Sequence, residues 1–534
     1  MDPKNISRRA LLGAAGFGGL SLTAMLAGCG DINNYPDSWD SVSPQSGKPN
    51  KGGVLRYGLS TEPVNFEPHV SSGAASDIIR VLTYSALLTY DKNGEVTGDL
   101  AVDYEWANPT EFKAKIPTNV RFHDGTLLTA DDVVYSYQRI MDPDTAATAA
   151  SLFSDVHRVE SRGTDTIVFT LKRPNNAFEF SLADAGARIV SKKWIENGAD
   201  AQTQVMGTGP FKFIERVPGV SILLEEFGDY FVPDLPYLKA IEFTPFKDDY
   251  ARVTALRTAT VDMIDYVPST HVDVIERNPQ LKVFSDDAFG FGLLGFVTTR
   301  PPFDDKRVRQ AVAYSIDRKA ALETAYLNHG QVMTGGLMPS AIAPYAETLE
   351  DSVGYDPDKA KYLMKQAGLS SLDMQIITTS SYSVIARPAE AMLPSLRKTS
   401  INPTLDRQEW LSFQATVEAR KYPSFVWGTA LKYGHPGAIS EIIGSSSRWA
   451  KFMDFSDEKI DKLLADAKRQ TNKNVANEIY HETEKLLLDR MPCTFTLRRI
   501  QGEAAHQYIK GYFHPPKGAW NQIALRETWI EERK

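Results

Sequence analysis

Apolar residues recur along most of the chain at the spacings of strands and helices. Val54–Leu59 and Thr166–Leu171 are rich in β-branched and aromatic residues, which predicts strands. Apolar residues three and four positions apart predict three helices. Their stripes are Val133, Val134, Tyr137, Ile140 and Met141; Val308, Ala311, Val312 and Ser315; and Ala360, Leu363, Met364 and Ala367. No repeat of fixed period is present, so the pattern indicates a large α/β or α+β protein.

The ends of two of these helices carry their own signals. Thr129 and Asp132 have the spacing of a capping box before the first helix, and Gly368 follows the third helix as a C-cap glycine does. Asp124-Gly125, just before the first helix, predicts a tight turn. We expect Asp131, Asp132 and Arg139 to be cap and surface charges rather than ligand contacts.

The N-terminal segment has a different pattern. Arg8 and Arg9 precede an apolar run rich in Gly and Ala, and small residues lead to Cys29, which is the three-part order of a secretory signal. Repeated glycines weaken a helix, and about 18 residues between Arg9 and Gly28 would barely span a bilayer. Residues 1–28 are therefore interpreted as a signal peptide rather than a permanent anchor.

Two short motifs refine this interpretation. Ser7-Arg8-Arg9-Ala10-Leu11-Leu12 resembles a twin-arginine export signal, although two arginines before an apolar run also suit the general export route. Leu26-Ala27-Gly28-Cys29 is similar to the lipobox of bacterial lipoproteins, which implies lipidation of Cys29 and a mature chain that begins there. An ordinary cleaved signal with a chance match is the alternative. Residues 29–51 are dominated by Asn, Asp, Ser, Pro and Gly and are expected to be a flexible tether.

Composition and charge limit the classes that remain. Residues 1–28 hold three basic residues and one acidic residue, so their removal changes the formal net charge from -8 to -10. A mildly acidic surface argues against nucleic acid as a partner and against electrostatic docking on a membrane. The only other cysteine is Cys493, so with Cys29 lipidated no disulfide can form. Roughly 480 ordered residues allow two or three domains.

Catalytic and metal-binding motifs were sought and not found. The chain has no H-E-x-x-H, no G-x-S-x-G and no His/Cys/Asp cluster with ligand spacing, so neither an enzyme activity, a cofactor nor a metal is implied. His481 and Glu484 stand at helical spacing, and we expect them on a solvated face. Gly290-Phe291-Gly292-Leu293-Leu294-Gly295 resembles a dinucleotide-binding loop, but the following "FVTTRPPFDD" opens no helix. A strand whose glycines allow close backbone approach is the prediction there.

Several segments, in order, carry a family resemblance. "VRFHDGTLLTADDVVYSYQRIMDP" (120–143) resembles the signature segment of the family 5 solute-binding proteins, the peptide, dipeptide and nickel receptors of ABC importers. "GTGPFKF" (207–213), "TRPPFDDKRVRQAVAYSIDRKA" (299–320) and "GYDPDKAKYLMKQAGL" (354–369) are similar to further blocks of that family. The opening "GGVLRYGLSTEPVNFEPH", followed by "LTYSALLTYDKNGEVTGDLAVDYEW", is similar to its N-terminal strand and first helix. The resemblance covers nearly everything from Gly52 onward.

The resemblance implies an α/β protein with the two-lobed periplasmic-binding-protein type II fold, an extra third domain and a ligand cleft between the lobes. From the family's chain course we expect lobe I at 52–72, 207–290 and 505–534, the extra domain at 73–206 and lobe II at 291–504. The chain would cross between lobes near Phe289–Phe296 and near Leu497–Ala505. Gly290 and Gly292 would then be hinge residues on a crossing strand, since hinges are a few residues that absorb backbone rotation.

The same resemblance implies a receptor, not an enzyme. It would be an extracytoplasmic monomer, lipid-anchored to a membrane, that encloses a peptide or similarly sized solute and delivers it to an ABC permease and its ATPase. A solute sensor acting through a partner protein, a receptor for a sugar, opine or other non-peptide solute, and a hydrolase on this scaffold are the alternatives. The shared blocks are scaffold, so the sequence does not name the solute.

Candidate ligand-binding residues come from segments that would line the cleft. Asn65 and Phe66 lie in the loop after the first strand, where the family's receptors contact ligand. Lobe II would contribute Trp410, Trp427, Tyr433 and His435. Of the two tryptophans, Trp427 is expected to face the cleft, because its segment matches the one that meets the ligand in peptide receptors; core packing is the alternative for both.

One position departs from the peptide-binding pattern. Peptide-binding members have an aspartate three residues after the tryptophan that corresponds to Trp427, and it pairs with the α-ammonium group of the peptide. Ala430 stands there in this chain, followed by Leu431 and Lys432. We therefore expect peptides held by a free N-terminus to be poor ligands, unless the alignment slips or a carboxylate such as Glu441 replaces the missing one.

Overall fold

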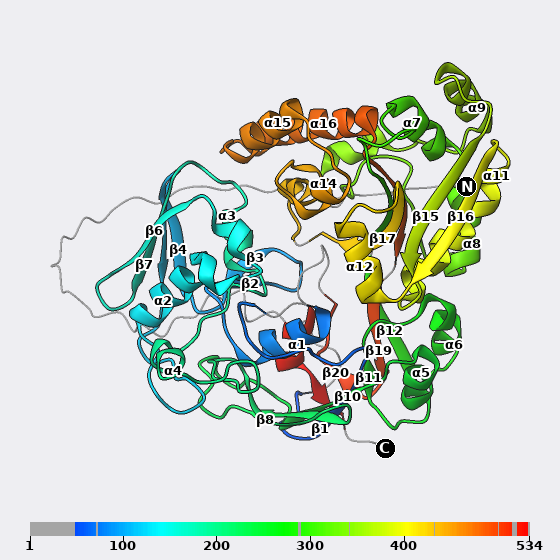
Figure 1. The fold of residues 1–534 in the computed structure, drawn as a ribbon. Coiled ribbons are helices and arrows are strands. Elements are labelled where there is room, and N and C mark those ends of the chain that lie inside the picture. Colours follow the sequence, from blue (N-terminus) through cyan, green and yellow to red (C-terminus); the bar gives the residue numbers. More distant parts are fainter. Residues whose placement is uncertain are drawn as a thin grey trace, which may run out of the picture. The chain divides into compact units, whose positions relative to one another are not determined.

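The structure is a computed structural model that describes residues 48–70, 73–286, 290–340, 342–431, 433–499, 501–514 and 521–531. The predicted signal peptide (1–28), the predicted lipidation site at Cys29 and most of the predicted tether lie outside the described residues. Three larger sheets, two two-stranded ladders and the helices packed on them make up the described chain (Figure 1).

The first large sheet has seven strands and collects segments from both ends of the chain. Its order is β12-β19-β11-β1-β10-β9-β8, with β1 parallel to both β10 and β11. The strands are β1 (Val54–Leu59), β8 (Phe211–Val217), β9 (Ser221–Glu226), β10 (Ala240–Pro245), β11 (Met263–Ile264), β12 (Leu281–Asp286) and β19 (Gln501–His506). Strand β19 inserts between β11 and β12, so residues more than 200 positions apart share hydrogen bonds.

The second large sheet has six strands in the order β14-β18-β13-β17-β15-β16. They are β13 (Gly290–Phe296), β14 (Gly330–Val332), β15 (Leu372–Thr379), β16 (Ile401–Gln408), β17 (Ser424–Ala430) and β18 (Cys493–Arg499). Strand β13 pairs antiparallel with both β17 and β18 at the centre of the sheet. The chain therefore passes from the seven-stranded to the six-stranded sheet between Asp286 and Gly290, and returns between Arg499 and Gln501.

A third, four-stranded antiparallel sheet has the order β4-β5-β7-β6. It consists of β4 (Asp103–Asn108), β5 (Glu111–Lys115), β6 (Val156–Arg162) and β7 (Thr166–Leu171). We call residues 84–210, which contain this sheet, the four-stranded unit. Two-stranded ladders complete the strands: β2 (Leu88–Tyr90) with β3 (Val96–Gly98), and β20 (Ile509–Lys510) with β21 (Trp529–Ile530).

The helices fall into three groups by the sheet they accompany. Helices α1 (Ala74–Thr83), α5 (Asp249–Arg257) and α6 (Val272–Glu276) go with the seven-stranded sheet, and α2 (Ala130–Met141), α3 (Phe178–Leu182) and α4 (Lys192–Glu196) belong to the four-stranded unit. The six-stranded sheet carries α7 (Lys306–Tyr314), α8 (Arg318–Tyr326), α9 (Pro357–Gln366), α10 (Ser383–Ala391), α11 (Leu393–Arg397), α12 (Trp410–Glu418), α13 (Ser440–Ile443), α14 (Arg448–Phe452), α15 (Glu458–Lys468) and α16 (Lys473–Arg490). Short 3-10 helices are η2 (Pro143–Thr145), η3 (Ala150–Phe153), η4 (Ser269–His271), η5 (Pro344–Leu349), η6 (Pro436–Ile439) and η7 (Asn521–Glu527).

Local sequence signals are confirmed where they concern short-range chemistry. Thr129 and Asp132 form both halves of a capping box at α2, and Gly368 has φ of 78° just after α9. Gly125 has φ of 86° in the predicted turn, where its N–H donates to the carbonyl of Phe122. The Gly290–Gly295 stretch is strand β13 and not a phosphate-binding loop.

The predicted domain boundaries stay predictions, but two packing facts bear on them. Ile78 and Leu82 of α1, assigned above to the extra domain, pack with Leu55 and Tyr57 in the core of the seven-stranded sheet. Strand β19 of that sheet begins at Gln501, slightly before the expected return to lobe I.

The "GTGPFKF" block has a steric role at the junction between α1 and β8. The N–H of Gly209 donates to the carbonyl oxygen of Thr83 at 3.0 Å. A Cβ atom on Gly209 would stand 2.6 Å from both the carbonyl oxygen of Leu82 and the carbonyl carbon of Thr83. Both neighbours are backbone atoms, which cannot move aside as a side-chain end can, so only glycine fits at Gly209.

We therefore expect Gly209→Ala to lower the free energy of unfolding by about 2 kcal/mol or more, as overpacking against a fixed backbone does. The matched control is Gly228→Ala, since no atom lies within 4 Å of a Cβ built on Gly228. Thermal and urea unfolding of both variants measure the difference. Equal stability of the two variants would contradict this steric account.

Candidate functional site

The loop after β1 holds Asn65 and Phe66, the first two predicted ligand-binding residues. Phe66 is only 4% exposed; its ring packs 4.8 Å from that of Phe213, and the guanidinium of Arg216 lies 5.5 Å from its centroid. The side-chain oxygen of Asn65 accepts from the N–H of Glu67 at 3.1 Å. The loop is thus folded onto the seven-stranded sheet through its own side chains.

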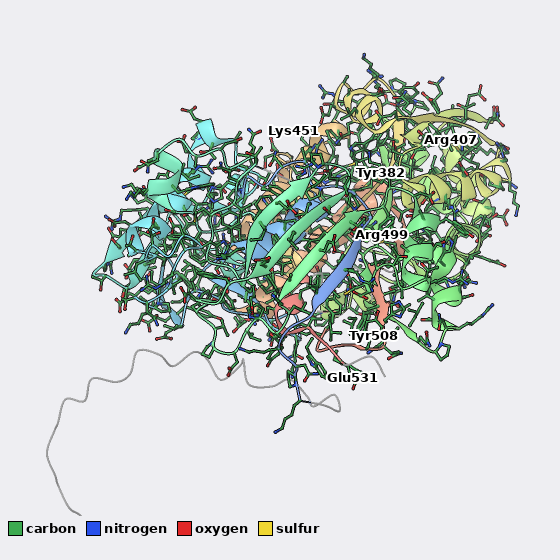
Figure 2. The ribbon with its side chains drawn as sticks, turned by 90° about the horizontal axis from the view of Figure 1, so that it is seen from below. Tyr382, Arg407, Lys451, Arg499, Tyr508 and Glu531 are labelled. Carbon is green, nitrogen blue, oxygen red and sulfur yellow. The ribbon has the colours of Figure 1, made fainter. Side chains whose placement is uncertain are left out.

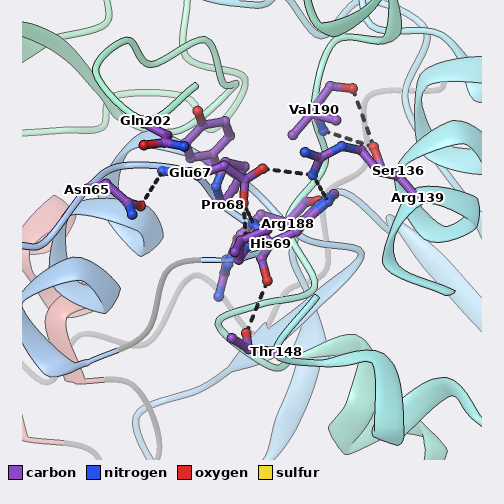
Figure 3. A network of polar contacts seen from close by, with 12 residues as sticks. Asn65, Glu67, Pro68, His69, Ser136, Arg139, Thr148, Arg188, Val190 and Gln202 are labelled. Atoms are coloured by element: carbon purple, nitrogen blue, oxygen red, sulfur yellow. Dashed lines mark hydrogen bonds and ion pairs between the residues drawn. The ribbon is translucent and has the colours of Figure 1, made fainter. Parts of the chain in front are cut away.

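A buried polar network fixes the next residues of this loop (Figure 3). One carboxylate oxygen of Glu67 lies 2.7 Å from Nη1 of Arg139 on α2, and the other accepts from the N–H groups of His69 and Val70. Nη1 of Arg139 also lies 2.7 Å from Nδ1 of His69. Arg139 therefore joins the loop to the four-stranded unit, and the expectation that it is a surface charge is wrong. Helical spacing alone did not reveal a partner 70 residues away.

His69 is fully buried in this network, and its contacts determine which ring nitrogen carries the hydrogen. Nε2 lies 2.8 Å from the carbonyl oxygen of Arg188, which can only accept, so Nε2 carries the hydrogen and Nδ1 accepts from Arg139. The carbonyl of His69 in turn accepts from the N–H and the hydroxyl of Thr148. Burial lowers the pKa of His69 from 6.5 to about 4, so this histidine is neutral near pH 7.

Trp410 and Trp427 are brought together in an aromatic cluster beside the six-stranded sheet. Their ring centroids are 5.1 Å apart, and Phe413, Trp449 and Phe452 surround Trp427. Tyr382, which Figure 2 labels, packs edge-on against Trp410 with the ring centroids 4.8 Å apart. Trp427 is 5% exposed, so it packs in this core; a role in the cleft stays a prediction.

Tyr433 lines a small cavity between the four-stranded unit and the helices of the six-stranded sheet. The cavity has a volume of about 40 Å³, space for a few water molecules. Asn175 and Ser181 line it from one side, and Tyr433, Glu441 and Tyr480 line it from the other. Phe180 bridges the two sides, since its ring lies 5.8 Å from Tyr433 and 5.3 Å from His435.

His435 lies beside this cavity, because its ring packs edge-on against that of Tyr480, which lines it. Its Nδ1 accepts from the N–H of Gly437 at 3.0 Å, which holds the start of η6. Burial lowers the pKa of His435 from 6.5 to about 4, so the ring offers no charge near pH 7. Glu441 is the acidic residue among those that line the cavity.

The predicted site residues therefore lie in three places: the Asn65–Phe66 loop, the Trp410–Trp427 cluster, and the cavity lined by Tyr433 with His435 beside it. Sequence analysis did not select Tyr480, Asn175, Ser181 or Phe180, which line or border the same cavity. Nothing local marks these residues, because Tyr480 reads as one more apolar position of α16 and Asn175 as a loop residue. Only the packing of distant segments brings them together.

Gly290 and Gly292, the predicted hinge residues, are the first and third residues of β13. Gly290 pairs with Ala430 and Gly292 with Gly428, so both already belong to the six-stranded ladder. A Cβ atom on Gly292 would lie 2.8 Å from the hydroxyl of Thr496 on β18. Close approach of β18 explains the absence of a side chain at Gly292, and the hinge role stays a prediction.

The expectation for His481 and Glu484 is wrong for the glutamate. Glu484 is fully buried, and its two carboxylate oxygens accept from the N–H groups of Leu337 and Met338 at 3.0 and 3.1 Å. Burial raises its pKa from 4.5 to about 8. His481 bonds instead to the hydroxyl of Thr348 at 2.8 Å. The loop after β14 covers the face of α16 that carries Glu484, which the i, i+3 spacing could not reveal.

The remaining chemical candidates are limited. Cys493 is a free, buried thiol whose pKa burial raises to about 12. Within the ranges described, no three His, Cys, Asp or Glu side chains gather as a metal site requires. In the same ranges no helix combines the length and the apolar character needed to cross a bilayer.

The chain crosses between the two large sheets at two adjacent places, and the four-stranded unit is inserted between α1 and β8, which both belong with the seven-stranded sheet. This arrangement defines a two-lobed binding protein of the periplasmic class. The lobes are built on the seven-stranded sheet (lobe I) and the six-stranded sheet (lobe II). The chain belongs to the bacterial extracellular solute-binding proteins, family 5, whose middle region matches residues 95–451.

Similar proteins support this assignment over almost the whole length. The oligopeptide-binding protein AppA of Bacillus subtilis is 26% identical over 95% of this chain and 97% of its own. The structure of AgaA from A. tumefaciens R10 in complex with agropinic acid matches with a TM-score of 0.82 and 27% identity, over 90% of this chain and 99% of that one. DppA of Helicobacter pylori in complex with the peptide STSA matches with a TM-score of 0.80 at 20% identity over 90% and 99%, a likeness of fold. These relatives are binding proteins.

The neutral state of His69 gives a stability that depends on pH. Between pH 6.5 and about 4 an unfolded His69 takes up a proton that the folded protein excludes, so stability is lost as the pH falls through this range. At pH 5 the loss from His69 relative to pH 7 is on the order of 2 kcal/mol. We expect the pH dependence of thermal unfolding to flatten in His69→Asn, even if that variant is less stable throughout.

His157→Asn is the control, because His157 is exposed on β6 and lies outside the network. An unchanged slope between pH 7 and 5 in His69→Asn would contradict this account, because it would show that His69 takes up its proton equally in the folded and the unfolded protein.

Proposed function

We propose that this chain is the solute receptor of an ABC importer, exported from the cytoplasm, held on the outer face of a membrane by lipid on Cys29, and without enzymatic activity. It captures a solute by closure of lobe I and lobe II and delivers it to a membrane permease. Membership in family 5 supports the receptor class. The Leu26-Ala27-Gly28-Cys29 motif and the polar segment 29–51 support the anchor and its tether.

The anchor is tested by labelling cells with a radioactive or clickable fatty acid. Cys29→Ser should abolish the label and release the protein from the membrane fraction, because the acylated sulfur is gone. Cys493→Ser should keep the label, because Cys493 is buried in β18. Label that persists in Cys29→Ser would rule out the proposed anchor.

The solute class rests on one observation, Ala430. It is the last residue of β17, where it pairs with Gly290 at the start of β13, and its side chain is exposed. Peptide receptors of the family have an acidic side chain at the matching position. A buried ammonium group without a counter-charge costs several kcal/mol, enough to lose two or more decades of affinity.

The solute is therefore one without a free N-terminal ammonium: an opine, a blocked or modified peptide, or a sugar conjugate. The likeness to AgaA, whose structure contains agropinic acid, favours an opine among these.

A second candidate class of solute, peptides with a free N-terminus, follows from Glu441. This carboxylate lines the cavity together with Tyr433, Tyr480 and the cationic Lys468, and it is the group there that could pair with an ammonium group. A receptor that uses Glu441 would accept free peptides in spite of Ala430.

Isothermal titration with matched peptides separates the two classes. One set has free N-termini, the other is N-acetylated, and agropinic acid is a third probe. We expect the free set to bind no better than the acetylated set, and Glu441→Gln to leave both affinities within a factor of about two. Tight binding of free peptides that acetylation and Glu441→Gln both abolish would instead establish Glu441 as a replacement anion.

A receptor that signals through a partner would bind its solute equally well but would not support uptake.

A further inference from the structure

The four-stranded unit is joined covalently only to lobe I. The chain enters it after α1, which packs on the seven-stranded sheet, and leaves it at β8 of the same sheet. Every contact between this unit and lobe II is therefore non-covalent. A relative movement of the lobes must break or keep these contacts as a group, because the unit has no other connection to lobe II.

One of these contacts caps a helix of lobe II. The backbone N–H of Asn176 donates to the carbonyl oxygen of Lys468 at 2.9 Å. Its side-chain amide donates to the carbonyl oxygens of Ala467 at 2.9 Å and of Gln470 at 3.2 Å. Carbonyl groups at the C-terminus of a helix have no partner further along the helix. Asn176 thus supplies donors from one unit to the end of α15 in the other.

The second contact is an ion pair with unequal partners. Asp155 is 1% exposed; one of its oxygens lies 2.6 Å from Nζ of Lys468, and the other accepts from Nε of Arg173 at 2.6 Å. Arg173 belongs to the same unit as Asp155, whereas Lys468 belongs to lobe II. When the units separate, Asp155 keeps Arg173, and Lys468, already 36% exposed, passes into water. Neither charge is left buried and unpaired, so the contact can form and break at a modest cost.

We propose that Asp155, Asn176 and Lys468 form a closure latch, through which the four-stranded unit holds lobe II in the closed form. This inference rests on the proposed function, because closure is the binding step of that function. The latch acts on the population of the closed form and not on the solute. An apparent dissociation constant is the intrinsic one divided by the closed fraction, so the latch changes the affinity for every solute by the same factor.

Hydrogen exchange on the full chain, without solute, tests the latch directly. The amide hydrogen of Asn176 is bonded to Lys468 only when the two units are in contact. We expect Lys468→Met to speed exchange in a peptide that covers residues 173–178 about five- to tenfold, and Asn176→Asp to do the same for the amides around residue 176. Arg448→Met is the matched control: it breaks an ion pair of 2.7 Å with Glu418, and both residues lie within lobe II.

Small-angle scattering of the same variants shows whether the lobes themselves respond. The latch predicts a larger radius of gyration in Lys468→Met and Asn176→Asp than in Arg448→Met, with the midpoint of thermal unfolding unchanged. Exchange at 173–178 that stays at the wild-type rate, or that rises without any change in radius, would overturn the proposal, because the contact would then be permanent or merely fray. Since neither measurement contains solute, a failure of the latch is told apart from a failure of the proposed solute class.

Discussion

The two crossings of the chain between the large sheets are the constraint on which the rest of this structure depends. β12 and β19 are paired neighbours in lobe I, and their continuations β13 and β18 are paired neighbours in lobe II. The two covalent links between the lobes therefore run side by side. Two adjacent links leave one rotation comparatively free and resist the others, so the lobes can approach each other along a defined path. Everything distant from the crossings, including the four-stranded unit, moves furthest along that path.

The polar contacts of the four-stranded unit are of two kinds: those with lobe I are rigid, and those with lobe II can break. Glu67, Arg139 and His69 tie the loop after β1 to the four-stranded unit by largely buried bonds, and opening them would separate the buried carboxylate of Glu67 from its cationic partner. Lobe I and the four-stranded unit should accordingly move as one body. Lys468 is partly solvated and Asp155 retains a second partner, so the contact with lobe II has the opposite character. The same kinds of side chain thus form a lasting contact with lobe I and a reversible contact with lobe II.

The sequence predicts those features that depend on neighbours in the chain. The capping box at Thr129, the turn at Gly125 and the strand at Gly290–Phe296 all follow from residues within a few positions of each other, and ordered motif blocks identified the family. Arg139 and Glu484 were misjudged for the opposite reason, since their partners lie 70 and about 147 residues away. The cavity near Tyr433 could not be anticipated at all, because its walls come from segments some 250 residues apart that are each unremarkable alone.

The single buried thiol of Cys493 has a consequence for where this protein can fold. Its pKa is raised to about 12, so near neutral pH it is almost entirely the unreactive thiol, enclosed at the start of β18. The chain has one other cysteine, Cys29, far from the folded body in sequence. The folded body therefore needs no disulfide-forming oxidant to mature, and its buried thiol is shielded from oxidation. The native state of the folded body therefore does not depend on whether its surroundings are reducing, as in the cytoplasm, or oxidising, as outside the cell.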